Sequence, residues 1–263
     1  MLALICGTGT LPSQVALAQT EKPLVCILEG FEPDYLGADL SFRLETLGSL
    51  LIQLRQHGVT DVCLCGAIDR PGFDPSKLDE HTAPFIPLIA GALTSGDDGA
   101  LRTVMGLFEQ TGFTVRAAHE LVPDLIAPPG ILSEKWPDAQ MREDARLGAS
   151  VLAALAPMDV GQACVTGGGQ LIGMETIGGT NFMLSHLPDT VLRAQGVLVK
   201  GPKLGQDIRA DMPTIGPETI TNVVNSGLSG IVINAGDVIF LEPEKCIAMA
   251  NAAGLVLWSR TGE

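Results

Sequence analysis

One stretch of the chain, residues 199 to 217, gathers many of the side chains that could do chemistry. It reads VKGPKLGQDIRADMPTIGP and places Lys200, Lys203 and Arg209 among Asp207 and Asp211. Its glycines and prolines exclude a long helix or strand, so we expect a loop, where binding and catalytic groups concentrate. Cations suit phosphate oxygens, and paired carboxylates suit a hard metal ion or a proton transfer. The alternative is a solvated loop whose charges pair with one another.

The composition narrows the class of protein. A length of 263 residues allows one large domain or two of ordinary size. Apolar residues make up 46%, aromatic residues only 4%, and 31 residues are glycine, which favours a closely packed α/β protein. Lys and Arg number 16 and Asp and Glu 30, so the net charge is −14. This balance argues against a nucleic-acid surface or a polybasic membrane patch, and it makes the cations near Lys200 stand out as a pocket for an anion.

The cysteines and the start of the chain indicate where the protein resides. Six cysteines lie mostly in apolar runs such as LALIC and LVCIL, as expected of small buried side chains in a reducing compartment. Cys63 and Cys65 share a face of a predicted strand, but no further Cys or His at ligand spacing supports a zinc site. MLALICGTGTLP has neither a basic leader nor a long apolar run, so we expect a cytoplasmic protein.

The first half of the chain alternates predicted strands and helices. Apolar runs at residues 2–6, 24–28, 59–65 and 113–117 predict strands, and leucine spacing from Leu44 and apolar spacing from Leu101 predict helices. This order predicts a Rossmann-like, right-handed parallel sheet. GTGTLP and GAIDRP, which contain Gly9 and Gly66, would then follow strands, where open parallel sheets bind ligands. GTGTLP lacks the third glycine of a dinucleotide fingerprint.

The second half of the chain has a different order of predicted helices and strands. Periodicity is lost between residues 123 and 137, so we predict one domain over residues 1–128 and another over 138–263. The second begins with a helix over 138–156 and a hairpin of 163–166 with 170–175. A short helix after IGGTNFML, a strand over 197–200 and a helix from Pro217 to Val224 follow. A strand pair of 231–234 with 238–241, a helix over 246–253 and a strand over 255–258 complete an α+β domain.

The residue types exclude some chemistries and favour another. The chain has no G-x-S-x-G, Walker or H-E-x-x-H motif, and its four histidines are scattered. The second domain instead offers Glu175 at a strand end and Thr180 and Asn181 after a double glycine, followed by the charged loop with Gln206. These groups suit clamping a phosphate, holding Mg²⁺ and positioning water.

Ordered motifs along nearly the whole chain resemble one family. GPKLGQDIRADMPTIGPETI is similar to the signature K-x-x-K-x-G-Q-D-x-R-x-D-L-P-x-I-G-P-x-T of the UDP-2,3-diacylglucosamine diphosphatases of the LpxI type. GTGTLP, GAIDRP, GDDGALR, DVGQACV and GLSGIVINAG extend the resemblance. It implies a Rossmann-like amino-terminal domain, a carboxyl-terminal domain of its own fold, and a role in lipid A biosynthesis.

The resemblance also implies a reaction and partners. Water attacks the uridine-side phosphorus of UDP-2,3-diacylglucosamine and releases UMP and 2,3-diacylglucosamine 1-phosphate (lipid X), with Mg²⁺ or Mn²⁺ required. A lipid substrate suggests transient contact with the inner membrane surface, and a homodimer is possible; no nucleic-acid partner is expected.

Site residues follow from the resemblance position by position. Asp211 matches the family's essential aspartate, and Asp211 with Glu175 would hold the metal ion. The substrate-binding residues implied are Gly9, Gly66, Ala67, Thr180, Lys200, Lys203, Gln206, Asp207 and Arg209. The family's E-G-T-D is here Gly178, Gly179, Thr180 and Asn181, and Asn251 stands where Asp is usual.

Other interpretations remain open at this point. A noncatalytic nucleotide-sugar sensor on the same fold would suit the changes at 178 and 181, and a nicotinamide-dependent oxidoreductase is suggested only by the first domain. On a purely structural interpretation, Gly7 and Gly9 would only turn a strand into a helix. Lys200 and Lys203 would pair with Glu242 or Glu244, and Asp211 would bond backbone N–H groups.

Overall fold

The computed structural model describes residues 1–68, 71–94, 97–203, 207–209 and 212–261. The chain forms two compact units. The first runs from Met1 to Pro123 and includes residues 207–209, whereas the second contains the other described residues from Asp124 onward. The predicted α/β chain with a parallel-sheet first domain and a separate second domain is confirmed.

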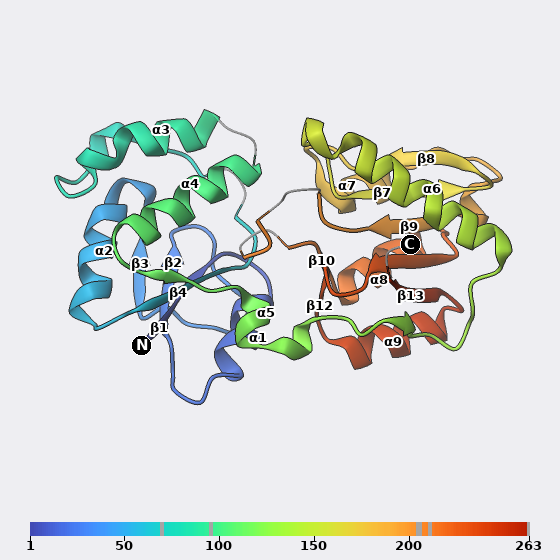
Figure 1. Cartoon of the computed structure of the whole chain (residues 1–263), viewed down its shortest axis with the longest axis horizontal. Helices are drawn as coiled ribbons and strands as arrows, with labels where there is room; N and C mark the ends of the chain where they lie inside the picture. Colours follow the sequence, from blue (N-terminus) through green and yellow to red (C-terminus); the bar gives the residue numbers. More distant parts are fainter. Residues whose placement is uncertain (69–70, 95–96, 204–206, 210–211, 262–263) are drawn as a thin grey trace. The chain divides into compact units, whose positions relative to one another are not determined.

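A parallel sheet forms the centre of the first unit (Figure 1). Its strands are β1 (Leu2–Cys6), β2 (Leu24–Leu28), β3 (Leu40–Phe42), β4 (Asp61–Cys65) and β5 (Thr114–Val115). They lie in the order β3-β2-β1-β4-β5, and each neighbouring pair is parallel. This order is that of the Rossmann fold, in which the chain winds outward in opposite directions from β1 and β4.

Helices bury one face of this sheet. The helices of the unit are α1 (Leu11–Leu17), α2 (Leu47–Gln56), α3 (Ile86–Thr94), α4 (Asp97–Gln110) and α5 (Ala118–Leu121). Short 3-10 turns lie at Leu44–Thr46, Pro75–Lys77 and Ala83–Phe85. Leu50 and Leu54 of α2 and Phe108 of α4 are buried in one cluster with Ala3 and Ile5 of β1, because alternate strand residues face the same side. This packing holds the carboxyl ends of the strands in a fixed array.

A mixed sheet forms the centre of the second unit. Its strands are β6 (Gly130–Ile131), β7 (Ala163–Gly167), β8 (Gln170–Met174), β9 (Val197–Lys200), β11 (Gly230–Asn234) and β13 (Val256–Arg260). They lie in the order β6-β13-β11-β9-β7-β8. β13, β11 and β9 are parallel, whereas β6, β7 and β8 join antiparallel. β7 and β8 form the predicted hairpin, whose turn has positive φ at Gly168 and Gly169.

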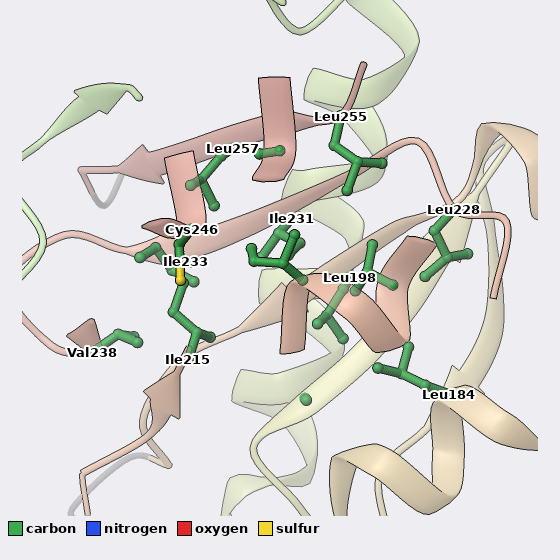
Figure 2. Close-up of a cluster of buried hydrophobic side chains, with 14 of the residues drawn as sticks. Leu184, Leu198, Ile215, Leu228, Ile231, Ile233, Val238, Cys246, Leu255 and Leu257 are labelled. Atoms are coloured by element: carbon green, nitrogen blue, oxygen red, sulfur yellow. The ribbon is translucent and has the colours of Figure 1, made fainter. Parts of the chain in front are cut away.

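Helices lie on both faces of the second sheet (Figure 1). These are α6 (Ala139–Leu155), α7 (Gly179–Ser185), α8 (Pro217–Asn225) and α9 (Pro243–Ala252), with 3-10 turns at Pro123–Leu125, Ala156–Met158 and Arg193–Gln195. α6 packs on the face that carries Val199 and Val232. Figure 2 shows the other face, where Leu198 and Ile231 lie in one cluster with Leu184 of α7 and Cys246 of α9. Ile220 of α8 belongs to the same cluster.

One strand pairing was predicted wrongly. Residues 231–234 and 238–241 were expected to pair as a hairpin, but β11 pairs with β9 and β13. β12 (Ile239–Phe240) pairs in parallel with β10 (Thr214–Ile215), a separate two-stranded sheet. Both edges of β11 are occupied by parallel neighbours, so no edge remains for the chain that follows it.

The cysteines agree with the interpretation as small buried side chains. All six are buried and none forms a disulfide. Burial also raises the pKa of the Cys26 and Cys164 thiols to about 12. Along the described parts of the chain, every helix is too short or too polar to span a bilayer.

Candidate functional site

Two predicted substrate-binding turns lie together in the first unit. Gly9 and Gly66 follow β1 and β4, the neighbouring strands between which the strand order reverses. Thr8 and Ala67 exchange backbone hydrogen bonds at N–O distances of 2.8 and 3.0 Å. Ligands of open parallel sheets bind at such a reversal, at the carboxyl ends of the strands. The structure therefore brings Gly9, Gly66 and Ala67 to the edge at which a nucleotide-type ligand is expected.

Glycine is needed at this edge for two physical reasons. The φ angles of Gly9 and Gly66 are +92° and +93°, values that favour glycine. A Cβ atom on Gly66 would also lie 2.6 Å from the Gly7 carbonyl oxygen. Gly66 thus lets the two turns approach more closely than a side chain permits. A Cβ atom on Gly9 would meet no atom within 4 Å, so its positive φ fits the interpretation of Gly9 as a strand-to-helix turn.

A hydrogen-bonded chain of three predicted site residues lies in the second unit. Lys200 ends β9, Glu175 follows β8, and Thr180 is the second residue of α7. Lys200 Nζ donates to Thr180 Oγ1 at 3.1 Å, and Thr180 Oγ1 donates to Glu175 Oε2. Glu175 Oε1 accepts from the Gln162 backbone N–H at 3.2 Å. Lys200 and Glu175 are both only 7% exposed, so this cluster places opposite charges inside the unit.

Lys203 has a carboxylate partner in the same unit. Its Nζ forms an ion pair with Asp159 Oδ1, and the Lys203 side chain is 15% exposed. Asp159 adopts the left-handed conformation, with φ of 52°, after the 3-10 turn that follows α6. Glu242, one of the partners considered for the lysines, forms an ion pair with Lys245.

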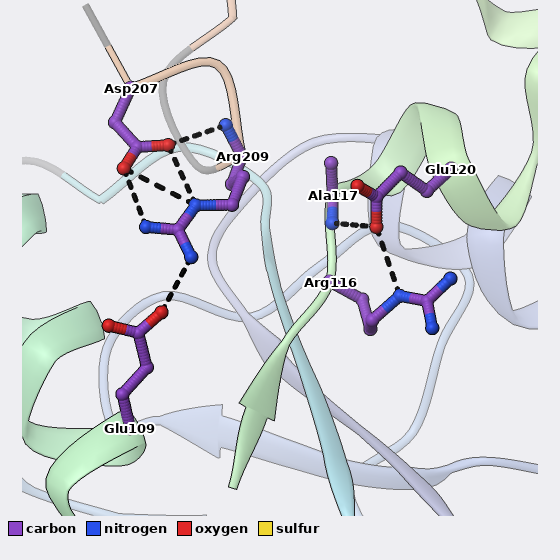
Figure 3. A network of polar contacts seen from close by, with 6 residues as sticks. All are labelled: Glu109, Arg116, Ala117, Glu120, Asp207 and Arg209. Atoms are coloured by element: carbon purple, nitrogen blue, oxygen red, sulfur yellow. Dashed lines mark hydrogen bonds and ion pairs between the residues drawn. The ribbon is translucent and has the colours of Figure 1, made fainter.

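Asp207 and Arg209 bind each other in the first unit (Figure 3). Arg209 Nε and Nη2 donate to the Asp207 carboxylate at 3.0 and 2.7 Å, and Arg209 Nη1 donates to Glu109 Oε1 at 2.6 Å. The hydrogen bonds from Arg209 lower the pKa of Asp207, with a smaller contribution from the charge of Arg102. The two carboxylates raise the pKa of Arg209. The guanidinium is therefore held in one orientation by Asp207 and Glu109.

A second polar contact in Figure 3 is local to its own segment. Arg116 Nε donates to Glu120 Oε2 at 2.9 Å, and the same oxygen accepts from the Ala117 backbone N–H at 3.3 Å. Both side chains are more than a third exposed. This contact supports the start of α5.

The remaining predicted residues, Gln206 and Asp211, lie outside the described residues. The described carboxylates do not by themselves fit a metal site, because no three His, Cys, Asp or Glu side chains come together in a group that could hold a metal ion. Both oxygens of Glu175 already accept hydrogen bonds. The assignment of Glu175 and Asp211 as metal ligands stays a prediction.

The two asparagines that depart from the family pattern have structural partners. Asn181 Nδ2 donates to Glu218 Oε1 at 2.8 Å, and its Oδ1 accepts from Asn222 Nδ2 at 2.9 Å. Asn181 thus joins α7 to α8, and an aspartate could not donate to Glu218. Asn251 Oδ1 accepts from the Glu134 backbone N–H at 2.8 Å.

Sequence reasoning missed three acidic partners of the site residues. Asp159 starts the quoted DVGQACV motif, but no role was assigned to it. Glu109 lies at the end of α4, 100 residues before Arg209, and Glu218 lies on α8 opposite Asn181. Pairs this distant in sequence carry no spacing signal, so only the tertiary structure identifies them.

The fold and the clusters define a class of protein. It is a two-domain α/β protein with glycine turns at the Rossmann-type reversal of one sheet and the buried cation Lys200 at the end of a strand of the other. Residues 1–125 match the LpxI N-terminal domain and residues 128–258 match the LpxI C-terminal domain. The UDP-2,3-diacylglucosamine pyrophosphatase LpxI of Caulobacter vibrioides is 34% identical over 268 residues, which cover 97% of this chain and 95% of that protein. The chain belongs to the LpxI family.

Proposed function

We propose that this protein hydrolyses the pyrophosphate bond of UDP-2,3-diacylglucosamine in lipid A biosynthesis. Water attacks the uridine-side phosphorus, and UMP and 2,3-diacylglucosamine 1-phosphate (lipid X) leave. The observation that carries the proposal is the 34% identity, along 97% of the chain, to the UDP-2,3-diacylglucosamine pyrophosphatase LpxI of Caulobacter vibrioides.

The described side chains offer what an anionic substrate requires. Lys200, Lys203 and Arg209 supply cations in a chain whose net charge is −14. Each is held by a hydrogen bond or ion pair, to Thr180, Asp159 and Asp207 respectively. A cation that is already oriented loses little conformational entropy when it binds phosphate. Each of these cations suits an anionic part of the substrate, and Asp211 is the proposed catalytic carboxylate.

A requirement for Mg²⁺ or Mn²⁺ is a separate part of the proposal. A divalent ion would neutralise charge on the phosphates. Glu175 and Asp211 are its proposed ligands. Removing metal ions with EDTA should stop UMP release, and adding Mg²⁺ or Mn²⁺ should restore it. Unchanged turnover in EDTA would remove the metal requirement and leave the hydrolysis intact.

The decisive experiment measures UMP release from UDP-2,3-diacylglucosamine by the wild type and by Asp211→Ala. Loss of one acid–base group lowers a rate by about 10² to 10⁴, so the variant should lose nearly all turnover while it still binds substrate. A variant that keeps more than about a tenth of the wild-type kcat, a barrier change below roughly 1.4 kcal/mol, would rule out this role for Asp211.

A noncatalytic nucleotide-sugar sensor is the second candidate. The changes at Gly178 and Asn181 favour it, since an acidic residue of the family pattern is replaced at each end of this segment. A wild type that binds UDP-2,3-diacylglucosamine but releases no UMP with Mg²⁺ or Mn²⁺ would establish the sensor and exclude the hydrolase.

We also propose that the protein contacts the inner membrane surface transiently and that it forms a homodimer. The membrane contact follows from the lipid substrate. Sedimentation equilibrium at several protein concentrations tests the dimer, and a single monomer mass would exclude it.

A further inference from the structure

The hydrogen bonds around Thr180 have a fixed direction. A threonine hydroxyl has one proton to donate and two lone pairs to accept with. An ammonium only donates and an ionised carboxylate only accepts. Lys200 therefore donates to Thr180, and Thr180 donates to Glu175, so the order of the chain is Lys200, Thr180, Glu175.

This direction limits what Thr180 can do for a ligand. While its proton is committed to Glu175, the hydroxyl has none to offer to a phosphate oxygen. A phosphate oxygen accepts hydrogen bonds, so the Thr180 side chain is a poor direct partner for it. Lys200 carries the charge that attracts phosphate, and its Nζ donates to Thr180 Oγ1.

Glu175 is anchored by the backbone of Gln162 and Ala163. Its Oε1 accepts from the Gln162 N–H, its backbone N–H donates to the Ala163 carbonyl at 2.9 Å, and its side chain is 7% exposed. A Cβ atom on Gly161 would lie 2.4 Å from the Glu175 carbonyl oxygen, so the two backbones are in close contact. The carboxylate thus has little freedom to move, and it fixes the Thr180 hydroxyl in turn.

Lys200 is anchored at the other end of the chain. It is the last residue of β9, which pairs with β11 on one side and β7 on the other. The next residue, Gly201, donates its backbone N–H to the Gln162 carbonyl at 3.1 Å. Gln162 therefore bonds with its N–H to the Glu175 side chain and with its carbonyl to the backbone beside Lys200. The backbone of Gln162 thus holds both Glu175 and the strand end that carries Lys200.

We propose that Thr180 and Glu175 are positioning residues, which hold the Lys200 ammonium in place for the diphosphate of the substrate. This inference rests on the proposed function for the identity of the ligand. It differs from the expected role of Thr180, which here acts through Lys200 instead of touching the substrate with its hydroxyl. It also gives Glu175 the role of orienting the Thr180 hydroxyl.

A double-mutant cycle tests the proposal with UDP as the probe, because UDP carries a diphosphate and is not the lipid substrate. Calorimetric Kd values are compared for the wild type, Thr180→Val, Lys200→Met and the double variant. Thr180→Val keeps the shape of the side chain and loses the hydroxyl, and should raise Kd about tenfold, a loss of about 1.4 kcal/mol. If Thr180 acts only through Lys200, the double variant should bind no more weakly than Lys200→Met alone.

Further variants separate positioning from a general loss of structure. Thr180→Ser retains the hydroxyl and should recover most of the affinity lost in Thr180→Val. Glu175→Gln has one side-chain oxygen for two donors, the Gln162 N–H and the Thr180 hydroxyl, so it should raise Kd for UDP. Adding Thr180→Val to Glu175→Gln should raise Kd little further. Ser185→Ala removes an exposed hydroxyl at the far end of α7, where Ser185 Oγ donates to the Phe182 carbonyl, and should leave Kd unchanged.

The outcomes distinguish this proposal from the hydrolase proposal. Additive losses for Thr180→Val and Lys200→Met would show that Thr180 contacts the ligand independently, and would overturn the inference. Failure of the wild type to bind UDP would overturn it as well. A wild type that binds UDP but releases no UMP from the lipid would defeat the hydrolase proposal alone, because the cycle is measured without turnover.

Discussion

At the scale of single residues, Arg209 shows why the type of cation matters. Its guanidinium bonds through Nε and Nη2 to Asp207 and through Nη1 to Glu109. A lysine has one nitrogen and cannot reproduce this fork. We expect Arg209→Lys to raise KM for UDP-2,3-diacylglucosamine about tenfold and to change kcat less, measured by UMP release. Unchanged kinetics in Arg209→Lys would mean that Arg209 serves only to bind Asp207 and Glu109.

The contact between Asp207 and Arg209 also makes stability depend on pH. Arg209 holds the pKa of Asp207 below its usual value of 3.8 in the folded protein. The carboxylate therefore contributes stability above the unfolded pKa, and that contribution is lost as pH falls through the lower folded pKa. The free energy of unfolding of the wild type should exceed that of Asp207→Asn at about pH 6, and the difference should shrink below about pH 4.

Urea unfolding at a series of pH values measures this difference. In an Arg209→Met background the cause of the lowered pKa is absent, so Asp207→Asn should have little effect at any of these pH values. A difference between wild type and Asp207→Asn that stays constant down to about pH 3 would contradict the role of Arg209.

At the scale of elements, Asp144 connects α6 to the β7–β8 hairpin. Its side chain is fully buried, its Oδ1 accepts from the Gly169 N–H at 2.7 Å, and its Oδ2 accepts from the Gly168 N–H at 3.0 Å. Thr166 Oγ1 also donates to the Asp144 carbonyl at 2.7 Å. One helix residue therefore satisfies the N–H groups of a turn in a neighbouring strand pair.

We expect Asp144→Ala to lower the free energy of unfolding by about 2 to 4 kcal/mol, because it leaves donors without a partner and creates a small cavity. Asp144→Asn keeps one acceptor oxygen and should lower the free energy of unfolding by less than Asp144→Ala does. Glu143→Ala, whose side chain is 64% exposed, is the matched control and should change stability by less than about 0.5 kcal/mol. Equal stability of Asp144→Ala and Glu143→Ala in urea would exclude the connecting role.

Elements with a strong periodic or apolar signal were predicted closely from the sequence. β2 (Leu24–Leu28) and β9 (Val197–Lys200) have the predicted bounds, and α6 differs by one residue at each end. β3, β10 and α3 were missed. β3 and β10 have only three and two residues, too few to show a period, and α3 (Ile86–Thr94) carries a proline at its second residue and is apolar on most sides.

Strand pairing was predictable only where a short turn joins the two strands. The β7–β8 hairpin follows from the adjacent glycines at its turn, whereas the partners of β11 come from positions 197–200 and 256–260. An apolar run shows that a strand is buried and does not show what it pairs with. The same limit applies to the candidate site, where the residue types were evident but the partners Asp159 and Glu109 were not.

At the scale of the whole molecule, the net charge governs how the protein approaches a membrane. A charge of −14 repels anionic phospholipid headgroups, and added salt screens that repulsion. The proposed membrane contact must therefore come from apolar side chains, and several in the second unit are largely exposed, among them Ile177 at 92% and Trp136 at 70%.

We expect the protein to cosediment more with phosphatidylcholine vesicles than with phosphatidylglycerol vesicles at low ionic strength. On raising NaCl from about 20 mM to about 200 mM the Debye length falls from roughly 20 Å to roughly 7 Å, so binding to phosphatidylglycerol should increase. A polybasic protein behaves in the opposite way, since salt releases it from anionic lipid. Binding to phosphatidylglycerol that decreases with salt would reveal a local basic contact surface, and no binding to either lipid at any salt concentration would exclude the membrane contact.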